Sequence, residues 1–267
     1  MNDQFDPFPP QTTTSQRVPI TISPIFGLIL LITIITGALT YLRMGNPRLM
    51  VFLFVMSGWI VSLCLHEFGH ALVAYLGGDK SVVGQGYLSL NPLKYTHGVL
   101  SIVMPLVFLA LGGIGLPGGA VYINLGEIPS KRMQSLTSAA GPITTALCGV
   151  VVSLPFLIGL ADLSLADHFE FWAGLAFLAS LEFTALFLNL IPIPGLDGFG
   201  IIAPFLPNNV LARIRGFGSY TLLILFVLFF NPTFNRIFWS SILFITSLLQ
   251  IPPALISQGL RLFQFWD

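Results

Sequence analysis

Long apolar stretches decide what this chain can fold into. Several runs of about 19 residues or more contain few charges. A helix needs about 20 apolar residues to cross a hydrocarbon core of roughly 30 Å, and an isolated segment in lipid satisfies its backbone hydrogen bonds as a helix. The sequence therefore predicts an all-α polytopic membrane protein with about six transmembrane helices. The apolar runs are 24–42, 49–76, 98–116, 135–160, 171–191 and a broken pair at 218–230 and 237–251.

The composition agrees with this prediction and excludes other classes of protein. Of 267 residues, 55% are hydrophobic and 8% are charged, whereas soluble domains carry about 25% charged residues. The net charge is zero and the basic residues are scattered, which does not indicate nucleic-acid binding. Cys64 and Cys148 lie singly in apolar segments, so we interpret them as small core residues and not as a disulfide.

Four parts of the chain differ in composition. Residues 1–23 are polar and rich in Pro and Thr, which predicts a flexible tail. A cleaved signal peptide is not expected, because the first apolar run begins late and is too long. We expect an accessory transmembrane helix at 24–48, a membrane core at 49–206 and C-terminal membrane segments at 207–267. The hydrophilic connections are short, so the function must reside in the membrane core and its loops.

The connection at 77–97 contains strand-forming residues punctuated by glycines and ended by Asn91-Pro92. This pattern predicts a short membrane-associated β-hairpin, although an ordinary interhelical loop fits the same residues. A strand at 82–90 would offer an edge to which an extended peptide could add. The strand formers are Val82, Val83, Tyr87, Leu88 and Leu90.

Residues 66–70 read His-Glu-Phe-Gly-His within the apolar run 49–76. On a helix, His66 and His70 lie one turn apart on the same face, within reach of one ion. Glu67 can serve as a general base toward water. Because His and Glu are costly at bilayer depth and usually functional there, the motif favours a metal site over a satisfied polar cluster between helices.

A catalytic zinc site needs a third protein ligand and an open position. His97 ends a loop and His168 lies in an acidic loop, so both are expected to be solvated. Asp197 is the better candidate, because Pro192, Pro194 and other residues before it must unwind the helix that ends near 191. A carboxylate at such a break is hard to explain without a cation. A plain helix-ending turn with Asp197 at the surface fits the same residues.

Together these residues resemble the two-part signature of the site-2 proteases, a family of intramembrane zinc metalloproteases. The resemblance covers about residues 49–206 and its motif is specific. The matching residues are His66-Glu67-Phe68-Gly69-His70, then Asn189, Pro192 and Asp197-Gly198, and Gly141-Pro142, which resembles a Gly-Pro-x-x-Asn element of the family.

The resemblance implies how these residues act. His66, His70 and Asp197 would bind Zn²⁺ as the cofactor, and Glu67 would activate water. Asn189 would contact the substrate or its oxyanion.

Two positions depart from the family pattern. Thr145 stands where the Gly-Pro element usually ends in asparagine, which puts that polar contact in doubt. Glu182 lies seven residues before Asn189 on the same helix face, where related sequences more often carry a neutral residue. It could shape the active site or the substrate path, or it could only pair with a hydroxyl group of a neighbouring helix.

The two histidines and Asp197 can meet only if the helix that carries the histidines and the helix that ends before Asp197 run in the same direction. If 49–76, 98–116, 135–160 and 171–191 all cross fully, the first and last are antiparallel. A re-entrant path at 98–116, which contains Pro105 and continues into a Gly-rich stretch, restores the same direction. The sequence therefore predicts a re-entrant segment there.

Loop charges favour the re-entrant arrangement. With it, the basic residues up to 215 divide seven to two between the two faces, and the positive-inside tendency puts the richer face in the cytoplasm. The zinc site then lies toward the cytoplasmic side. The seven are Arg17, Lys80, Lys94, Lys131, Arg132, Arg213 and Arg215, and the two are Arg43 and Arg48.

The sequence therefore predicts a multi-pass zinc metalloendopeptidase of a bacterial-type cell membrane. Its partners would be the lipid bilayer, a transmembrane protein substrate cut in or next to a helix, and a regulatory membrane protein, as in regulated intramembrane proteolysis. Two other functions fit the same residues. One is a channel or transporter for metal ions or protons, and the other is a catalytically silent relative that binds membrane segments.

Overall fold

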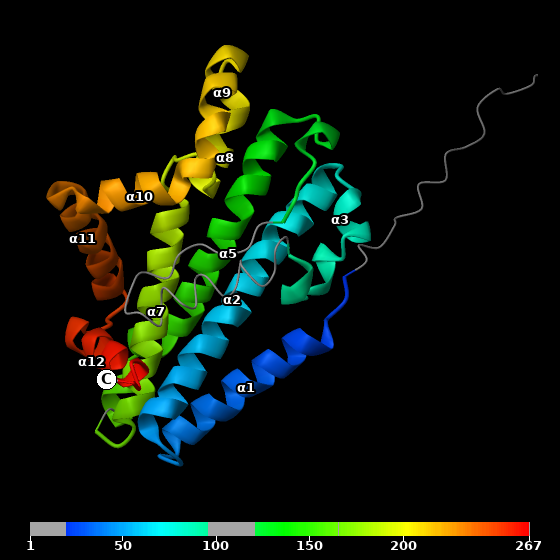
Figure 1. The fold of residues 1–267 in the computed structure, drawn as a ribbon. Helices are drawn as coiled ribbons and strands as arrows, with labels where there is room; N and C mark the ends of the chain where they lie inside the picture. The colour runs from blue at the N-terminus through cyan, green and yellow to red at the C-terminus, as the bar shows by residue number, and fades with distance from the viewer. Residues whose placement is uncertain (1–19, 96–120, 165, 267) are drawn as a thin grey trace, which may run out of the picture.

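The computed structural model describes residues 20–95, 121–164 and 166–266, and helices dominate them (Figure 1). In this part of the chain, five helical segments are long and apolar enough to cross a membrane, or six if one bent pair counts as a single span. The chain is therefore a multi-pass membrane protein. The five are α1 (Pro24–Tyr41), α2 (Pro47–Gly77), α5 (Lys131–Leu157), α7 (Phe169–Asn189) and the segment Asn208–Phe230.

Polar caps fix where the long helices begin. The side chain of Ser23 accepts a hydrogen bond from the backbone N–H of Ile25, and the side chain of Asn46 accepts one from Leu49. A proline follows each cap at the first helical position, where its missing N–H costs nothing. Ser130 caps α5 in the same way, without a proline. These local signals place the helix ends at the borders of the apolar runs.

Small residues allow three helices to pack closely at the centre of the bundle. One face of α5 carries a glycine or a small hydroxyl residue at every fourth position, and all five are buried. Residues four apart share a helix face, and small side chains let membrane helices approach closely. Along this face α5 contacts α2 first and α7 further on. The five are Thr137, Gly141, Thr145, Gly149 and Ser153.

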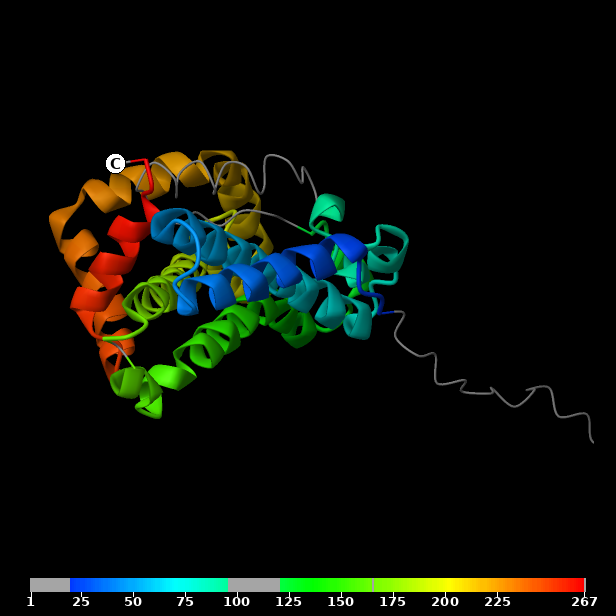
Figure 2. The same cartoon turned by 90° about the horizontal axis from the view of Figure 1, so that it is seen from below.

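Helix α7 is the central helix of the fold. Of its most apolar stretch, 78% is buried inside the protein, against 22% for α1. Helix α12 (Pro253–Phe263) lies directly on it, so closely that a Cβ on Gly259 would overlap the carbonyl oxygen of Ala173. Figure 2 shows α7 enclosed by α2, α5 and α12 when the bundle is seen from below.

The helices α2 and α7 run in the same direction, and α5 runs opposite to both (Figure 1). The direction that the metal hypothesis requires is therefore present. Helix α2 ends and α5 begins at the same end of the bundle. The predicted re-entrant segment 98–116 lies outside the described residues.

The β-hairpin predicted within 77–97 is wrong for its described part, 77–95. Three short helical turns occupy that segment: α3 (Ser81–Gly84), η1 (Tyr87–Ser89) and η2 (Pro92–Lys94). Most apolar side chains of the segment pack together against α2 in one cluster and do not alternate between two faces, although Val83 and Leu93 are exposed. Asp79, which is fully buried, accepts hydrogen bonds from the backbone N–H and the hydroxyl of Ser81 and starts the first turn. The proposed substrate-pairing edge at 82–90 is therefore absent.

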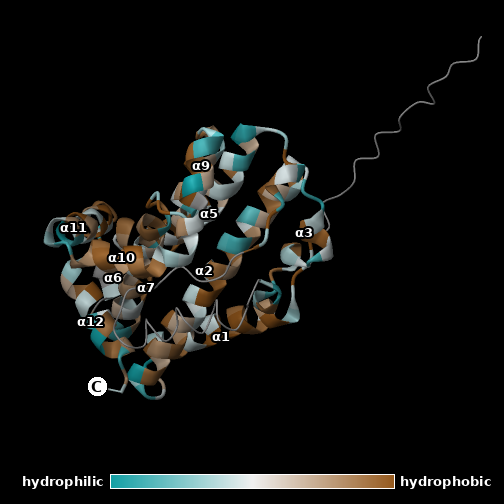
Figure 3. Cartoon of the chain, turned by 45° about the horizontal axis from the view of Figure 1, so that its top comes forward, coloured by the Kyte–Doolittle hydropathy of each residue, from teal (hydrophilic) through white to brown (hydrophobic). Residues whose placement is uncertain are grey.

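The C-terminal part wraps one side of the bundle (Figures 1 and 2). After Asn189 the chain forms α8 (Asp197–Ile202), η4 (Ala203–Phe205), α9 (Asn208–Arg215), η5 (Gly216–Tyr220), α10 (Thr221–Phe230) and α11 (Pro232–Leu248). Helices α11 and α12 meet at a bend of 110°. Figure 3 shows hydrophilic residues on α9 and on the adjacent end of α5, whereas α10 is hydrophobic. The remaining short elements are η3 (Leu125–Glu127) and α6 (Leu160–Ser164).

Candidate metal centre

The two histidines of the motif face α5 from the second half of α2. Both are 6% exposed, and their Nε2 atoms lie 3.1 Å apart. The rings are nearly perpendicular, with an interplanar angle of 80°. His66 and His70 therefore direct one nitrogen each at a common point, as their spacing of four residues predicts.

The other ring nitrogens are held by α5. Nδ1 of His70 lies 2.7 Å from the carbonyl oxygen of Thr137, which can only accept a hydrogen bond. The proton of a neutral His70 ring must therefore be on Nδ1, which leaves the lone pair of Nε2 free to bind a metal. Nδ1 of His66 lies 2.8 Å from the hydroxyl oxygen of Thr145.

Gly141 provides the space in which the two Nε2 atoms lie. It falls between Thr137 and Thr145 on the same face of α5, and a Cβ there would overlap Nε2 of both His66 and His70. Only glycine allows α5 to approach the histidines this closely.

Asp197 completes the cluster from the break after α7. Its Oδ1 lies 3.2 Å from Nε2 of His70, and its Oδ2 lies 3.2 Å from Nε2 of His66. The turn that brings it there depends on Gly195, which has φ +94°, and on Gly198, where a Cβ would overlap the carbonyl oxygen of Leu190. The Thr221 hydroxyl lies 2.5 Å from the carbonyl oxygen of Pro194 and ties α10 to this break.

The surroundings of Asp197 act on its pKa in opposite directions. Burial by itself raises the pKa, but the rings of His70 and His66, when they carry an additional proton, outweigh burial and hold it below its ordinary value. An ionised carboxylate is the form that binds a metal.

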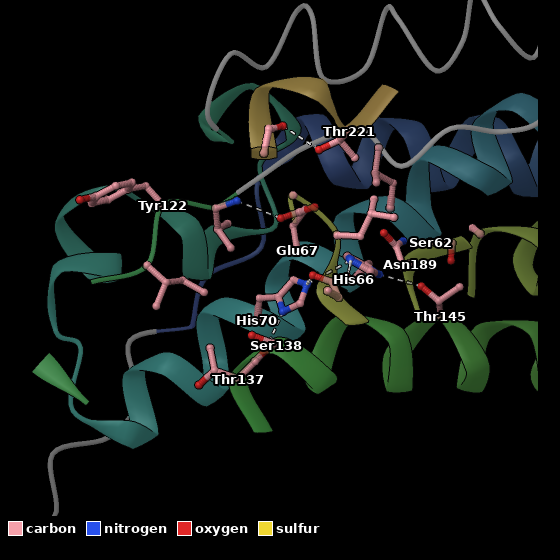
Figure 4. A pocket seen from close by; sticks show the side chains of 18 of the residues that line it. Ser62, His66, Glu67, His70, Tyr122, Thr137, Ser138, Thr145, Asn189 and Thr221 are labelled. Atoms are coloured by element: carbon pink, nitrogen blue, oxygen red, sulfur yellow. Dashed lines mark hydrogen bonds and ion pairs between the residues drawn. The ribbon is translucent and has the colours of Figure 1, made fainter. Parts of the chain in front are cut away.

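Glu67 and Asn189 line the same cavity, which has a volume of about 660 Å³ (Figure 4). Glu67 is 2% exposed, and its Oε2 accepts a hydrogen bond of 3.1 Å from the backbone N–H of Val121. Asn189 is buried at the end of α7. All five predicted site residues, His66, Glu67, His70, Asn189 and Asp197, therefore lie around one cavity.

Of the two histidines outside the motif, His168 does not join this cluster. His97 lies outside the described residues. The expectation that His168 is solvated was wrong: it is half-buried, its ring stacks on Tyr41 at 3.6 Å between centroids, and its Nδ1 lies 2.6 Å from the carbonyl oxygen of Tyr41. His168 thus joins the start of α7 to the end of α1. Cys64 and Cys148 are free thiols. Cys64 is buried, which confirms its interpretation as a core residue, whereas Cys148 is half-buried.

Curated relatives match this chain over two thirds of its length or more. A protein of Mycolicibacterium smegmatis named "Putative zinc metalloprotease Rip2" is 41% identical over 250 residues, which cover 92% of this chain and 94% of the relative. The protein of the same name from Mycobacterium tuberculosis is 41% identical over 95% of this chain and 98% of its own length. "Putative zinc metalloprotease YwhC" of Bacillus subtilis is 30% identical over 67% of this chain and 81% of its own length. The chain belongs to the site-2 protease family of zinc metalloproteases. No family model and no solved structure matches it.

The cluster of this site-2 protease fits Zn²⁺, the cofactor of its family. Its three ligand atoms lie within 4.8 Å of one another. Two imidazole nitrogens and one carboxylate oxygen form a ligand set that catalytic zinc sites use, with a fourth position open. Oδ2 of Asp197 is also buried without a hydrogen-bond donor, as expected of an atom that binds a cation.

Sequence reasoning missed part of what holds the ligands of this site-2 protease. The Thr137 carbonyl was not anticipated, and Thr145 was noted only as a departure from the family pattern. The signal was present in the spacing: Ser62, His66 and His70 recur every four residues on α2, as do Thr137, Gly141 and Thr145 on α5. When α2 and α5 pack antiparallel, the same four-residue spacing on both helices brings each histidine opposite a residue of the α5 face.

Proposed function

We propose that this protein is an intramembrane zinc endopeptidase that hydrolyses a peptide bond in or next to a transmembrane segment of another protein. One observation carries the proposal: His66, His70 and Asp197 converge in a cavity enclosed by helices long and apolar enough to cross a membrane. His and Glu at such depth are costly and usually functional. In this proposal the three residues bind Zn²⁺.

Zn²⁺ bound there would polarise a substrate carbonyl and make a water molecule more acidic. Glu67 follows His66 directly and faces the same cavity. It can therefore accept the proton of the attacking water as the new C–O bond forms, and later return it to the leaving amine. The hydrogen bond from Val121 holds one oxygen of this carboxylate in place.

Asn189 supports the same step from α7. Its amide group can donate a hydrogen bond to the oxyanion that develops on the attacked carbonyl, a contact worth about 3 kcal/mol in other hydrolases. The carbonyl groups of a helical substrate are already hydrogen-bonded, so the substrate segment must unwind before it enters the cavity.

The arrangement of charges supports a cytoplasmic orientation of the site. Lys80, Lys131 and Arg213 lie at or near the end of the bundle where α2 ends, α5 begins and α9 lies, and Arg43 and Arg48 flank the opposite end. The metal ligands lie toward the first of these ends. By the positive-inside tendency this end faces the cytoplasm. In this proposal a regulatory membrane partner controls access of the substrate.

Two substitutions test the proposed function in protein reconstituted into liposomes with a library of transmembrane peptides. Glu67→Gln should abolish cleavage, detected by mass spectrometry, and retain zinc, measured by elemental analysis. Asp197→Ala should lose both. Glu170→Gln, a carboxyl-to-amide change at the far end of α7, is the matched control and should retain both. Wild-type cleavage by Glu67→Gln, or a full zinc complement in Asp197→Ala, would contradict the proposal.

A further inference from the structure

A third carboxyl group lines the cavity besides those of Glu67 and Asp197. Glu182 of α7 is 2% exposed, and its Oε2 accepts a hydrogen bond of 2.5 Å from the hydroxyl of Ser62 on α2. Among the described residues no donor reaches its other oxygen, Oε1. The pairing with a neighbouring hydroxyl that the sequence suggested is therefore present, but it accounts for one oxygen only.

The position of Glu182 places it beside the reaction centre and not within it. Ser62 lies four residues before His66 on α2, which is about 6 Å along a helix axis. Glu182 lies seven residues before Asn189 on α7, which is about 10 Å. Because α2 and α7 run in the same direction, both spacings put Glu182 on the same side of the metal cluster, deeper along the bundle. Ser62, Thr145 and Asn189 line the same cavity as Glu182 (Figure 4).

We propose that Glu182 is a specificity-determining residue that accepts a hydrogen bond from an uncharged polar side chain of the substrate segment. This inference rests on the proposed function. An extended chain advances about 3.3 Å per residue, so the side chain that reaches Glu182 belongs to a residue within about three positions of the cut bond. Its chemical class is a hydroxyl or a carboxamide, as in Thr or Asn.

Hydrogen-bond chemistry gives the direction of the preference. A carboxyl group offers acceptor capacity on its oxygens whether it is ionised or protonated. An apolar substrate side chain would cover Oε1 and leave it without water or a donor, which is costly for a buried polar atom. Sites built around such a polar group discriminate strongly against an analogue that lacks the donor.

The experiment compares nearly isosteric pairs of transmembrane peptides, Asn against Leu and Thr against Val, at each of three positions on either side of the cut bond. Binding is measured in liposomes with the Glu67→Gln protein, so that the readout does not require cleavage. At one position we expect the polar peptide to bind about tenfold more tightly, which corresponds to ~1.4 kcal/mol. Adding Glu182→Leu should reduce this ratio to about one, and adding Glu182→Gln, which keeps an acceptor, should preserve most of it. Glu170→Gln should leave the ratio unchanged.

The outcomes separate this inference from the proposed function. An equal ratio in the proteins with and without the Glu182→Leu substitution, at all six positions, would overturn the role of Glu182, even if the wild-type protein cleaves peptides. If the binding ratio depends on Glu182 but the wild-type protein never cleaves a peptide, the recognition site would be supported and the proposed protease function would be contradicted. Lower thermal stability of Glu182→Leu with an unchanged ratio would show that Glu182 only joins α2 to α7.

Discussion

The two halves of the metal centre are held in different ways. His66 and His70 belong to an unbroken helix, and the outer nitrogen of each ring is fixed by a neighbouring helix. Asp197 follows a break in the chain whose path depends on a glycine with positive φ and on a threonine hydroxyl from α10. The histidine half is built from regular packing, and the carboxylate half from an irregular turn.

This difference indicates which parts of the site tolerate amino-acid substitution. Packed helices leave little room for relaxation, so an added atom between α2 and α5 must displace a ligand. The turn before Asp197 can shift locally at a cost in strain. Substitution of the residues that pack around the histidines should therefore change metal binding, and substitution of the turn residues before Asp197 should mainly change stability.

Gly141→Ala should give the largest effect. Its Cβ would occupy the space of both Nε2 atoms, so zinc content should fall close to zero and peptide cleavage should be lost. Elemental analysis of the purified protein checks this. Gly27→Ala on α1, where an added Cβ meets no atom within 4 Å, is the matched control and should keep its zinc. A fully loaded Gly141→Ala protein would mean that the histidine half is not tightly packed.

Thr145→Val should give an intermediate effect. The substitution removes the hydroxyl at Nδ1 of His66 and preserves the shape of the side chain. Loss of such a partner of a metal-binding histidine typically lowers metal affinity about 10- to 100-fold. Titration with a zinc chelator measures the change. Thr145→Ser retains the hydroxyl and should retain most of the affinity, so equal losses in the two variants would argue against this hydrogen bond.

Gly195→Ala should give the smallest effect on the metal. The backbone there has φ +94°, and an added Cβ would overlap the hydroxyl of Thr221, so we expect a loss of about 1–3 kcal/mol of stability. Zinc affinity should fall by less than about tenfold. A thermal unfolding curve beside the chelator titration separates the two quantities, with Gly216→Ala, which meets no atom within 4 Å, as control. Complete loss of zinc would remove the contrast between the two halves.

The sequence predicted that His66, His70 and Asp197 come together because each has a strong local signal. The His-Glu-x-x-His spacing places two rings on one helix face, and the Pro and Gly residues before Asp197 require the helix to stop. The common direction of the flanking helices followed from requiring the ligands to meet. Each of these inferences depends on residues close together in the chain or on the order of helices.

Other features depend on contacts between distant segments, which local patterns do not reveal. The turns at 81–94 stand in place of the predicted hairpin because most of their apolar residues pack in one cluster against α2, which strand propensity does not reveal. The bond from Val121 to Glu67 joins residues 54 positions apart. Thr145 was read as a missing asparagine because only the packed structure places its hydroxyl on His66.

The contact between α12 and α7 has a consequence for how much of the chain the chemistry requires. Phe263 is fully enclosed and the α12 backbone touches that of α7 at Gly259, so the final helix forms one wall around the helix that ends in Asn189. No signature residue lies in that wall. The scaffold that keeps the reactive groups in place is thus longer than the stretch of sequence by which they are recognised.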